Sequence, residues 1–284
     1  MPTLDRYRFT GGTAVLTGAA SGMGEHMAHQ LAARGSDLVL IDRDEARLTT
    51  VADTLRGTHP DRTVHTHVAD LADTPALDDL AQRILADAPR ITLLINNAGV
   101  ALGGAFDQLT GEEFDWVIDI NFRAPVTLTR LLLPRLDAGA HIVNVSSLYG
   151  LIAPPGQSAY AASKFALRGF SEALRHELAE QGIGVTTVHP GGIRTRIAES
   201  ARVASGVDEQ QLARGRANYA KLLSYPADKA AARILDGVDR RKRRVLIASS
   251  AVIPDLLARL FPTRYMDVLY RLQPNSRPSA LRAR

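Results

Sequence analysis

Strand-length apolar runs alternate with longer amphipathic segments along most of this chain. The runs are rich in Val, Ile and Leu, and several are almost entirely apolar, which is typical of parallel strands buried on both faces of a sheet. They lie at residues 13–17, 37–41, 63–68, 91–95, 141–145, 184–188 and 244–248, and helices are predicted between them at residues 23–34, 44–57, 74–87, 111–136, 158–181 and 226–239. The alternation predicts an α/β fold with a doubly wound, seven-stranded parallel sheet and helices on both faces.

Composition excludes several kinds of protein. With 284 residues, of which 45% are hydrophobic and 23% charged, the chain is long enough for one large globular domain. It contains no cysteine, so disulfides, thiolate metal sites and cysteine nucleophiles are excluded. His65 and His67 share one face of the third predicted strand, but no third ligand accompanies them, so no metal site is predicted.

Two further absences bear on where the protein works. Residues 1–10 include Asp5, Arg6 and Arg8 and lack the apolar segment of a signal peptide. No uncharged apolar run reaches the roughly 18 residues that would indicate a membrane-spanning helix. A cytoplasmic protein is therefore expected.

A glycine-rich loop joins the first predicted strand to the first predicted helix and has the sequence Thr17-Gly18-Ala19-Ala20-Ser21-Gly22-Met23-Gly24. Glycines let the backbone approach a pyrophosphate, and the N-terminus of the following helix offers N–H groups and the positive end of its dipole. The spacing is Gly-x-x-x-Gly-x-Gly, which differs from the commoner Gly-x-Gly-x-x-Gly fingerprint. Its position between a strand and a helix favours a cofactor loop over an ordinary turn.

Asp42 ends the second predicted strand, eighteen residues after Gly24. A carboxylate there can accept hydrogen bonds from the adenosine ribose hydroxyls and would repel a 2′-phosphate, which favours NAD. Arg43 is adjacent and could pair with that phosphate, so NADP stays open as the alternative.

Tyr160 and Lys164 lie at positions i and i+4 of a predicted helix and therefore share one face. A phenol with an ordinary pKa near 10 is a poor base at neutral pH, but a neighbouring ammonium favours the phenolate. Such a pair can exchange a proton with an alcohol or a ketone. Ser147, thirteen residues upstream, could polarise the carbonyl, and its neighbour Ser146 is the rival for that role.

These motifs together resemble the short-chain dehydrogenase/reductase family over about residues 10–250, which implies a Rossmann-type fold. The resemblance rests on the loop of residues 17–24, Asn96-Asn97-Ala98-Gly99, Asp70-Leu71 and the segment of residues 190–195. It implies catalytic roles for Asn121, Ser147, Tyr160 and Lys164. The cofactor contacts that it implies are Gly18, Ser21, Gly22, Met23, Gly24, Asp42, Arg43, Asp70, Leu71, Asn97, Ala98, Gly99, Tyr160, Lys164, Pro190, Gly191, Ile193 and Thr195.

By this resemblance Tyr160 is the general acid/base, and Lys164 lowers the pKa of its partner and bonds the nicotinamide ribose. Ser147 would hold the substrate oxygen, while Asn121 would anchor a water in a proton relay. The family also commonly forms dimers or tetramers, here through the helices predicted at residues 111–136 and 158–181. A homo-oligomer is therefore expected.

The predicted function is an NAD-dependent interconversion of a secondary alcohol and a ketone on a small to medium, fairly apolar substrate. The first alternative is an NADPH-dependent ketoreductase acting on acyl or lipid ketones. A third hypothesis is a non-catalytic dinucleotide-binding or membrane-associated protein.

Residues 1–250 are predicted to form one cofactor-binding and catalytic domain, in which residues 194–225 form a helical substrate flap without a strand. Residues 251–284 are predicted to form a helical extension that breaks at Pro254 and Pro262 and has a disordered end.

Charge is concentrated near this extension. Residues 240–284 carry 11 Lys/Arg and 2 Asp/Glu, whereas the other 239 residues carry 23 and 28, within a total net charge of +4. Packing of the extension over the substrate mouth or a neighbouring subunit is preferred here to a contact with anionic lipid. The basic run of residues 240–244 has no interleaved aromatic residues, so nucleic-acid binding is not predicted.

Overall fold

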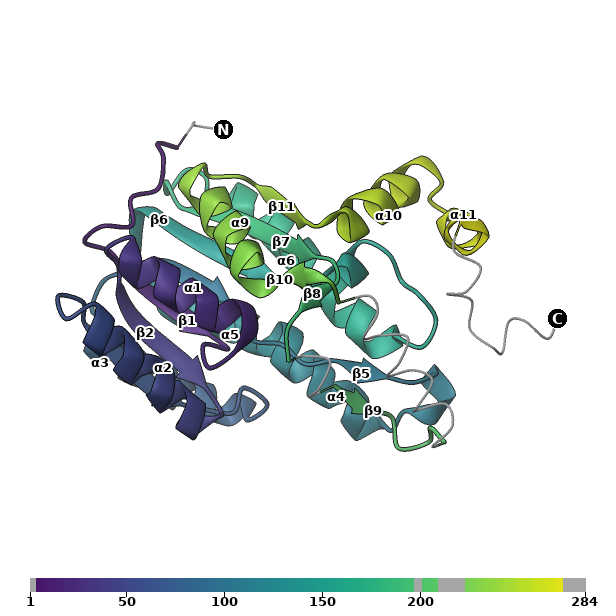
Figure 1. Cartoon of the computed structure of the whole chain (residues 1–284), viewed down its shortest axis with the longest axis horizontal. Helices are drawn as coiled ribbons and strands as arrows, with labels where there is room; N and C mark the ends of the chain where they lie inside the picture. Colours follow the sequence, from purple (N-terminus) through teal and green to yellow (C-terminus); the bar gives the residue numbers. More distant parts are fainter. Residues whose placement is uncertain (1–3, 197–200, 209–222, 273–284) are drawn as a thin grey trace.

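A seven-stranded, all-parallel sheet forms the centre of the computed structural model, which describes residues 4–196, 201–208 and 223–272 (Figure 1). The strand order is β11-β7-β6-β4-β1-β2-β3. The strands are β1 (Thr13–Thr17), β2 (Asp37–Asp42), β3 (Val64–Val68), β4 (Ile91–Asn96), β6 (Leu136–Val145), β7 (Gly184–Pro190) and β11 (Arg244–Ile247). The predicted seven-stranded Rossmann-type sheet is confirmed.

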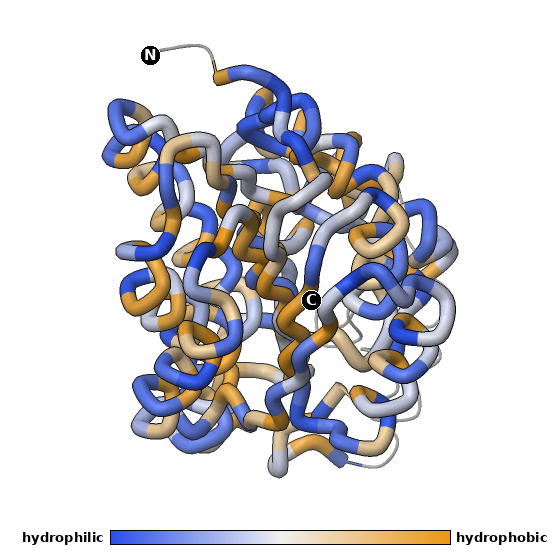
Figure 2. Tube along the Cα trace, turned by 90° about the vertical axis from the view of Figure 1, so that its left-hand side faces the viewer, coloured by the Kyte–Doolittle hydropathy of each residue, from blue (hydrophilic) through white to orange (hydrophobic). Residues whose placement is uncertain are grey.

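Helices cover both faces of the sheet and give it two apolar cores. One core contains side chains of α1 (Gly22–Ala33), α2 (Glu45–Thr58) and α9 (Ala227–Asp239). The other contains side chains of α3 (Leu77–Asp87), α5 (Ala124–Leu132) and α6 (Ser158–Glu177). In Figure 2 the strands in the middle of the molecule are orange, whereas the surrounding helices mix orange with blue. This distribution is the one expected when a sheet is buried on both faces.

The helix predicted at residues 111–136 is interrupted. It begins as α4 (Gly111–Ile118), passes through a π-helical turn (Asp119–Arg123) into α5 and ends in a 3₁₀ turn (Leu133–Arg135), after which Leu136 starts β6. In the π turn the N–H of Ala124 bonds to the carbonyl of Asp119, five residues earlier. Such turns are often found at functional sites, and this one contains Asn121.

The segment predicted as a flap without a strand contains short strands, so that part of the prediction is wrong. β9 (Arg202–Val203) pairs with β5 (Leu102–Gly103), and β8 (Ile193–Arg194) pairs with β10 (Tyr225–Pro226). The guanidinium of Arg202 also lies 4.0 Å from the centre of the Trp116 ring. Residues 197–200 and 209–222 of the predicted flap lie outside the described residues.

The C-terminal extension forms two helices, α10 (Ser249–Leu260) and α11 (Tyr265–Leu272), which lie beside the main body in Figure 1. Pro254 is accommodated inside α10, so the predicted break at this residue is wrong, and the chain turns only between Leu260 and Tyr265. None of the described helices is long and apolar enough to cross a membrane. The predicted disordered end, residues 274–284, lies outside the described part of the chain.

Two members of the basic run at residues 240–244 have structural contacts. Arg241 donates hydrogen bonds to the carbonyls of Gly139 and Ala140 and to Nδ1 of His141. Arg244 pairs with the carboxylate of Asp255 on α10. These two guanidinium groups join neighbouring segments of the fold.

Candidate active site

Twelve of the eighteen predicted cofactor residues line a cleft of about 260 Å³ at the carboxyl edge of the sheet, whereas Gly24, Tyr160, Lys164, Pro190, Gly191 and Ile193 do not. Because every strand of the sheet is parallel, the loops after β1, β2, β3 and β4 meet at the same edge. The chain order reverses between β1 and β4, and open α/β sheets bind ligands at such a switch point. The cleft is lined by Gly18, Ser21, Gly22, Met23, Asp42, Arg43, Asp70, Leu71, Asn97, Ala98, Gly99 and Thr195 of the predicted set.

The three glycines of the loop after β1 are each required by the local geometry. Gly18 and Gly22 have φ values of +68° and +57°, a region that costs other residues conformational energy. A Cβ on Gly24 would lie 1.8 Å from the carbonyl oxygen of Gly18, so no other side chain fits there without moving the loop. The backbone can therefore curve closely around the N-terminus of α1, where an anion is stabilised by the helix dipole.

Hydrogen bonds tie this loop to the segment that follows β4. The Oγ1 atom of Thr17 accepts the backbone N–H groups of Asn97 and Ala98, each at 3.0 Å. In return, the side-chain amide of Asn97 donates to the carbonyls of Thr17 at 3.0 Å and Gly18 at 3.2 Å. The two loops on either side of the switch point are thus held as one unit.

Asp42 lines the cleft and is positioned by two backbone donors. One carboxylate oxygen accepts the N–H of Ala20 at 2.9 Å, and the other accepts the N–H of Asp44 at 3.1 Å. Each oxygen retains a second lone pair for a ligand hydroxyl. Arg43 is exposed and lines the same cleft, so both candidate selectors border one space.

A dinucleotide fits this arrangement. The glycine loop offers a close backbone approach for a pyrophosphate, Asp42 lies at one end of the cleft, and Asn97 to Gly99 line its other part. Gly99 is next to the catalytic candidates, since a Cβ there would lie 3.1 Å from both Nζ of Lys164 and Oδ1 of Asn121.

Lys164 is buried one turn after Tyr160 on α6, with only 3% of its surface exposed. Its Nζ lies 5.8 Å from the centre of the Tyr160 ring and donates a hydrogen bond to the carbonyl of Val145 at 3.0 Å. Burial in a low-dielectric environment lowers the pKa of Lys164 to about 8. The ammonium group therefore carries its positive charge beside the phenol at neutral pH, about one pH unit below its pKa.

The structure separates the two candidate serines. Ser146 is buried, and its hydroxyl donates to the carbonyl of Lys164 at 2.8 Å, so it fixes α6 against β6. Ser147 is only partly buried and starts the 3₁₀ turn Leu148–Gly150, where its Oγ accepts the N–H of Tyr149 at 3.1 Å. Ser147 thus keeps a hydroxyl proton that it can donate to another acceptor.

Asn121 is completely buried, and its side chain joins three segments. Its Oδ1 accepts the N–H of Val100 at 2.9 Å, and its Nδ2 donates to the carbonyl of Val100 at 3.0 Å and to Oγ of Ser163 at 3.1 Å. The side chain therefore anchors the loop after β4 to α6. The predicted water relay at this residue stays a prediction.

The segment of residues 190–195 starts at the last residue of β7 and borders the cleft through Thr195. Side-chain atoms of Thr195 would lie 3.1 Å from a Cβ at Gly22, so this residue packs against the glycine loop. Gly191 meets α10 instead, because a Cβ there would lie 2.3 Å from Oγ of Ser250. Pro190 and Ile193 are buried and do not line the cleft.

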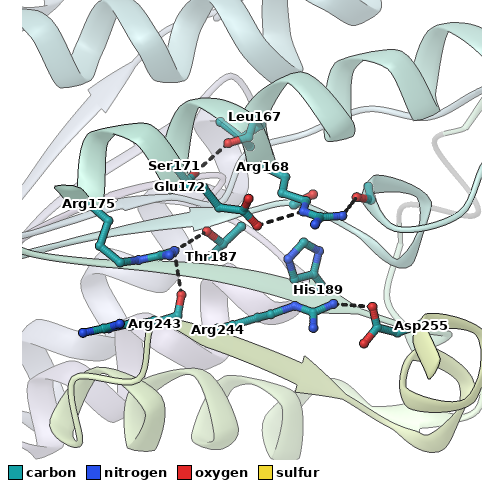
Figure 3. A network of polar contacts seen from close by, with 12 residues as sticks. Leu167, Arg168, Ser171, Glu172, Arg175, Thr187, His189, Arg243, Arg244 and Asp255 are labelled. Carbon is teal, nitrogen blue, oxygen red and sulfur yellow. Dashed lines mark hydrogen bonds and ion pairs between the residues drawn. The ribbon is translucent and has the colours of Figure 1, made fainter. Parts of the chain in front are cut away.

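Figure 3 shows His189 of β7 between Arg168 of α6 and Arg244, and Arg244 pairs with Asp255 of the C-terminal extension. Nδ1 of the fully buried His189 donates a hydrogen bond to the carbonyl of Ser147 at 3.0 Å, because a carbonyl can only accept. Desolvation lowers the pKa of His189 to about 4, so the ring is neutral at physiological pH. Nε2 of His189 and Nε of Arg244 are buried without a hydrogen-bond partner among the described residues. Arg244 in turn pairs with Asp255 of α10, which also binds Arg259.

Several residues of the site were missed by reasoning from the sequence. His189 was one of them, since a lone histidine at a strand end carries no signal of its own. The additional residues that line the cleft are Ala20, Ile41, Asp44, Arg47, Ala69, Val100, Ile120 and Arg196.

Among the described residues, no group of three side chains could hold a metal ion. His65 and His67 instead both face the carboxylate of Asp87.

Comparisons with known proteins identify the family of this chain. A family model described as short chain dehydrogenase matches residues 12–205. A Mycobacterium tuberculosis protein named as an oxidoreductase, SadH, is 38% identical over 268 residues, which cover 92% of this chain and 95% of that protein.

Solved structures are similar over nearly the whole chain. A short-chain dehydrogenase/reductase from Burkholderia phymatum, in complex with NAD, is 29% identical with a TM-score of 0.79 and covers 96% of this chain and 99% of that one. A short-chain dehydrogenase from Sphingobium yanoikuyae, in complex with NADPH, is 31% identical with a TM-score of 0.71 and covers 95% and 97%. The chain therefore belongs to the short-chain dehydrogenase/reductase family, whose members are oxidoreductases that use NAD or NADP.

Proposed function

We propose that this protein interconverts a secondary alcohol and a ketone, with NAD as the preferred cofactor and Tyr160 as the general acid/base. The single observation that carries the preference is the Asp42 carboxylate, held at the end of the cleft by the N–H groups of Ala20 and Asp44. A fixed carboxylate can bind a ribose diol through its free lone pairs and repels a 2′-phosphate.

The bound nicotinamide would accept a hydride from the carbinol carbon or return it to a carbonyl. Tyr160 would take the alcohol proton in one direction and supply it in the other. Lys164 supports this role, since a buried ammonium beside the ring stabilises the phenolate. Ser147 would donate its hydroxyl proton to the substrate oxygen, as its partly exposed position allows.

Cofactor preference can be tested without a known substrate. We expect a fluorescence titration of the purified protein to give a lower Kd for NADH than for NADPH. Asp42→Ala should weaken NADH binding and narrow the difference between the Kd values for NADH and NADPH. The substitution removes an acceptor for the ribose hydroxyls and a negative charge that repels the 2′-phosphate. An unchanged Kd ratio in this variant would overturn the role of Asp42.

An NADPH-dependent ketoreductase is the second candidate. It is supported by Arg43, which is exposed in the same cleft, and by Arg47, which also lines the cleft although it pairs with Asp44 at 3.3 Å. If this candidate is right, Arg43→Ala should weaken NADPH selectively and leave NADH binding nearly unchanged. Lys229→Ala, on α9 and outside the cleft lining, is the matched control for loss of a cation.

A homo-dimer or homo-tetramer in the cytoplasm completes the proposal. Phe165 on α6 has 38% of its surface exposed, which supports an intersubunit contact on this helix. Sedimentation equilibrium of the wild type and of Phe165→Glu tests the assembly: the variant should shift towards a smaller species if α6 forms the interface.

A further inference from the structure

Large exposed apolar side chains concentrate on one short part of the molecule. Of the eight that the described residues contain, five lie between residues 252 and 261. Val252, Leu256 and Leu260 are spaced four residues apart on α10 and share one face, with Ile253 beside them. The exposed fractions are 46% for Val252, 55% for Ile253, 55% for Leu256, 62% for Leu260 and 47% for Phe261. We call this set the α10 apolar face.

The opposite side of α10 is fixed to the protein. Ala251 and Asp255 are buried, and the Asp255 carboxylate pairs with Arg244 of β11 and with Arg259 of α10 itself. Ala251 also lies against the turn after β7, since its backbone nitrogen would be 3.0 Å from a Cβ at Gly191. These contacts hold the helix so that its apolar face points away from the main body.

Positive charge borders this face. Residues 249–272 contain three arginines and two aspartates, and one of the aspartates, Asp255, pairs with both Arg244 and Arg259. Arg259 lies one turn from Leu256 on the same helix and is 57% exposed, while Arg264 is exposed in the turn after Phe261. An apolar helical face with a cationic border fits the interface of an anionic bilayer.

A second copy of the chain fits this surface less well. Pairing two α10 apolar faces about a two-fold axis would place the arginines that border both copies at one interface, and this concentration of like charge opposes association. An anionic lipid surface instead offers both an apolar layer and complementary charge.

The helices α10 and α11 lie next to the segment that follows the candidate catalytic serine, Ser147. α10 packs against α11 and against the 3₁₀ turn that follows Ser147. The hydroxyl of Tyr265 on α11 accepts the backbone N–H of Ala153 at 3.0 Å, in the loop after that turn. A surface that holds α10 therefore lies beside the loop that follows the candidate catalytic serine.

We propose that the α10 apolar face, with Arg259 and Arg264 at its border and Arg271 exposed on the adjoining helix α11, docks peripherally on an anionic lipid surface. The apolar side chains enter the interface of the bilayer and the arginines approach the headgroups. No segment crosses the membrane in this arrangement. The docking depends on neither cofactor nor substrate, so its failure would leave the proposed function untouched.

Co-sedimentation of the full chain with vesicles tests the proposal directly. The wild type should bind vesicles of phosphatidylcholine with one quarter phosphatidylglycerol at least tenfold more tightly than pure phosphatidylcholine vesicles. High salt should weaken this binding, because the Debye length falls to about 3 Å at 1 M. Negligible binding of the wild type to both compositions would overturn the proposal.

Matched variants test whether the α10 apolar face is the surface that binds the vesicles. Leu256→Glu with Leu260→Glu should reduce the partition coefficient at least tenfold, whereas Phe106→Glu, at a remote side chain that is 72% exposed, should leave it unchanged. Arg264→Gln and Arg271→Gln should each reduce binding to the anionic vesicles by roughly fivefold. Equal binding by the wild type and the double leucine variant would overturn the assignment to α10.

Sedimentation velocity without lipid distinguishes a protein partner. The wild type and the double leucine variant should have the same molar mass, and thermal unfolding should show that both are folded. If the variant instead converts a dimer to a monomer while the wild type does not bind vesicles, a second copy covers the face and lipid docking is wrong.

Discussion

The ammonium nitrogen of Lys164 lies 5.8 Å from the centre of the Tyr160 ring and donates to the carbonyl of Val145 at 3.0 Å. This bond fixes a buried cation between α6 and the end of β6. With a pKa lowered to about 8 by desolvation, Lys164 is mostly protonated at pH 7. A positive charge is therefore present where a phenolate would form.

Tyr160→Phe removes the proton that the reaction needs and should keep the fold and the cofactor cleft. Turnover of a panel of secondary alcohols should fall by about 10²- to 10⁴-fold, the usual contribution of general acid–base catalysis. The Kd for NADH, measured by fluorescence, should change less than about twofold, because the Tyr160 ring does not line the cleft. Turnover above about a tenth of the wild-type value would contradict the assignment of Tyr160.

Gly24→Ala should disrupt the cofactor loop, because the new methyl group would lie 1.8 Å from the carbonyl oxygen of Gly18. We expect NADH affinity to fall by at least tenfold as the loop is displaced. Gly57→Ala is the control: its Cβ would have no neighbour within 4 Å, and in helix α2 alanine should add about 0.4–1 kcal/mol to the free energy of unfolding. NADH titration measures the loss of affinity in Gly24→Ala, and urea denaturation measures the gain in stability in Gly57→Ala. An unchanged Kd for NADH in Gly24→Ala would refute the close approach of Gly24 to the carbonyl of Gly18.

His189→Leu should leave the carbonyl of Ser147 without its buried donor. The loss of one partner of a buried hydrogen bond costs about 1–3 kcal/mol of stability, measurable by urea denaturation. His189→Asn places an amide donor near the position of Nδ1 and should recover much of the loss. Turnover should fall in the leucine variant and recover in the asparagine variant if this bond positions Ser147. Equal free energies of unfolding and equal turnover in the two variants would show that the hydrogen bond from His189 to Ser147 contributes to neither stability nor catalysis.

Acid should destabilise the protein through two buried histidines. Burial lowers the pKa of His141 to about 3 and of His189 to about 4, against about 6.5 in the unfolded chain. Between pH 6.5 and 4 the unfolded state therefore binds protons that the folded state does not, so the free energy of unfolding falls as pH falls. Each histidine contributes up to about 1.4 kcal/mol per pH unit in this window.

Urea denaturation at several pH values between 7 and 4.5 measures this dependence. His189→Asn should reduce the slope, because one of the two histidines is removed. A stability that stays constant from pH 6.5 to 5 would contradict the neutral, buried state of both rings.

Much of the fold could be predicted because buried parallel strands produce an apolar pattern that is local in the sequence. The residue range of β1 agrees with the prediction, and β11 starts at the predicted residue. The early start of β6 at Leu136 and the π turn at Asp119–Arg123 were not visible, since a helical pattern of apolar residues continues through both. Breaks of this kind depend on how neighbouring elements pack.

The sequence by itself determined the glycine loop, the Asp42 carboxylate at the end of β2 and the Tyr160–Lys164 pair, because each depends on residues close together in the chain. Only the tertiary structure decided which serine is partly exposed, since Ser146 and Ser147 differ by one position and only packing against α6 buries the first. It likewise decided that His189 supports Ser147 and that Asp255 orients α10. These contacts join segments distant in the chain, and burial and pairing across such distances arise only when the sheet and its helices assemble.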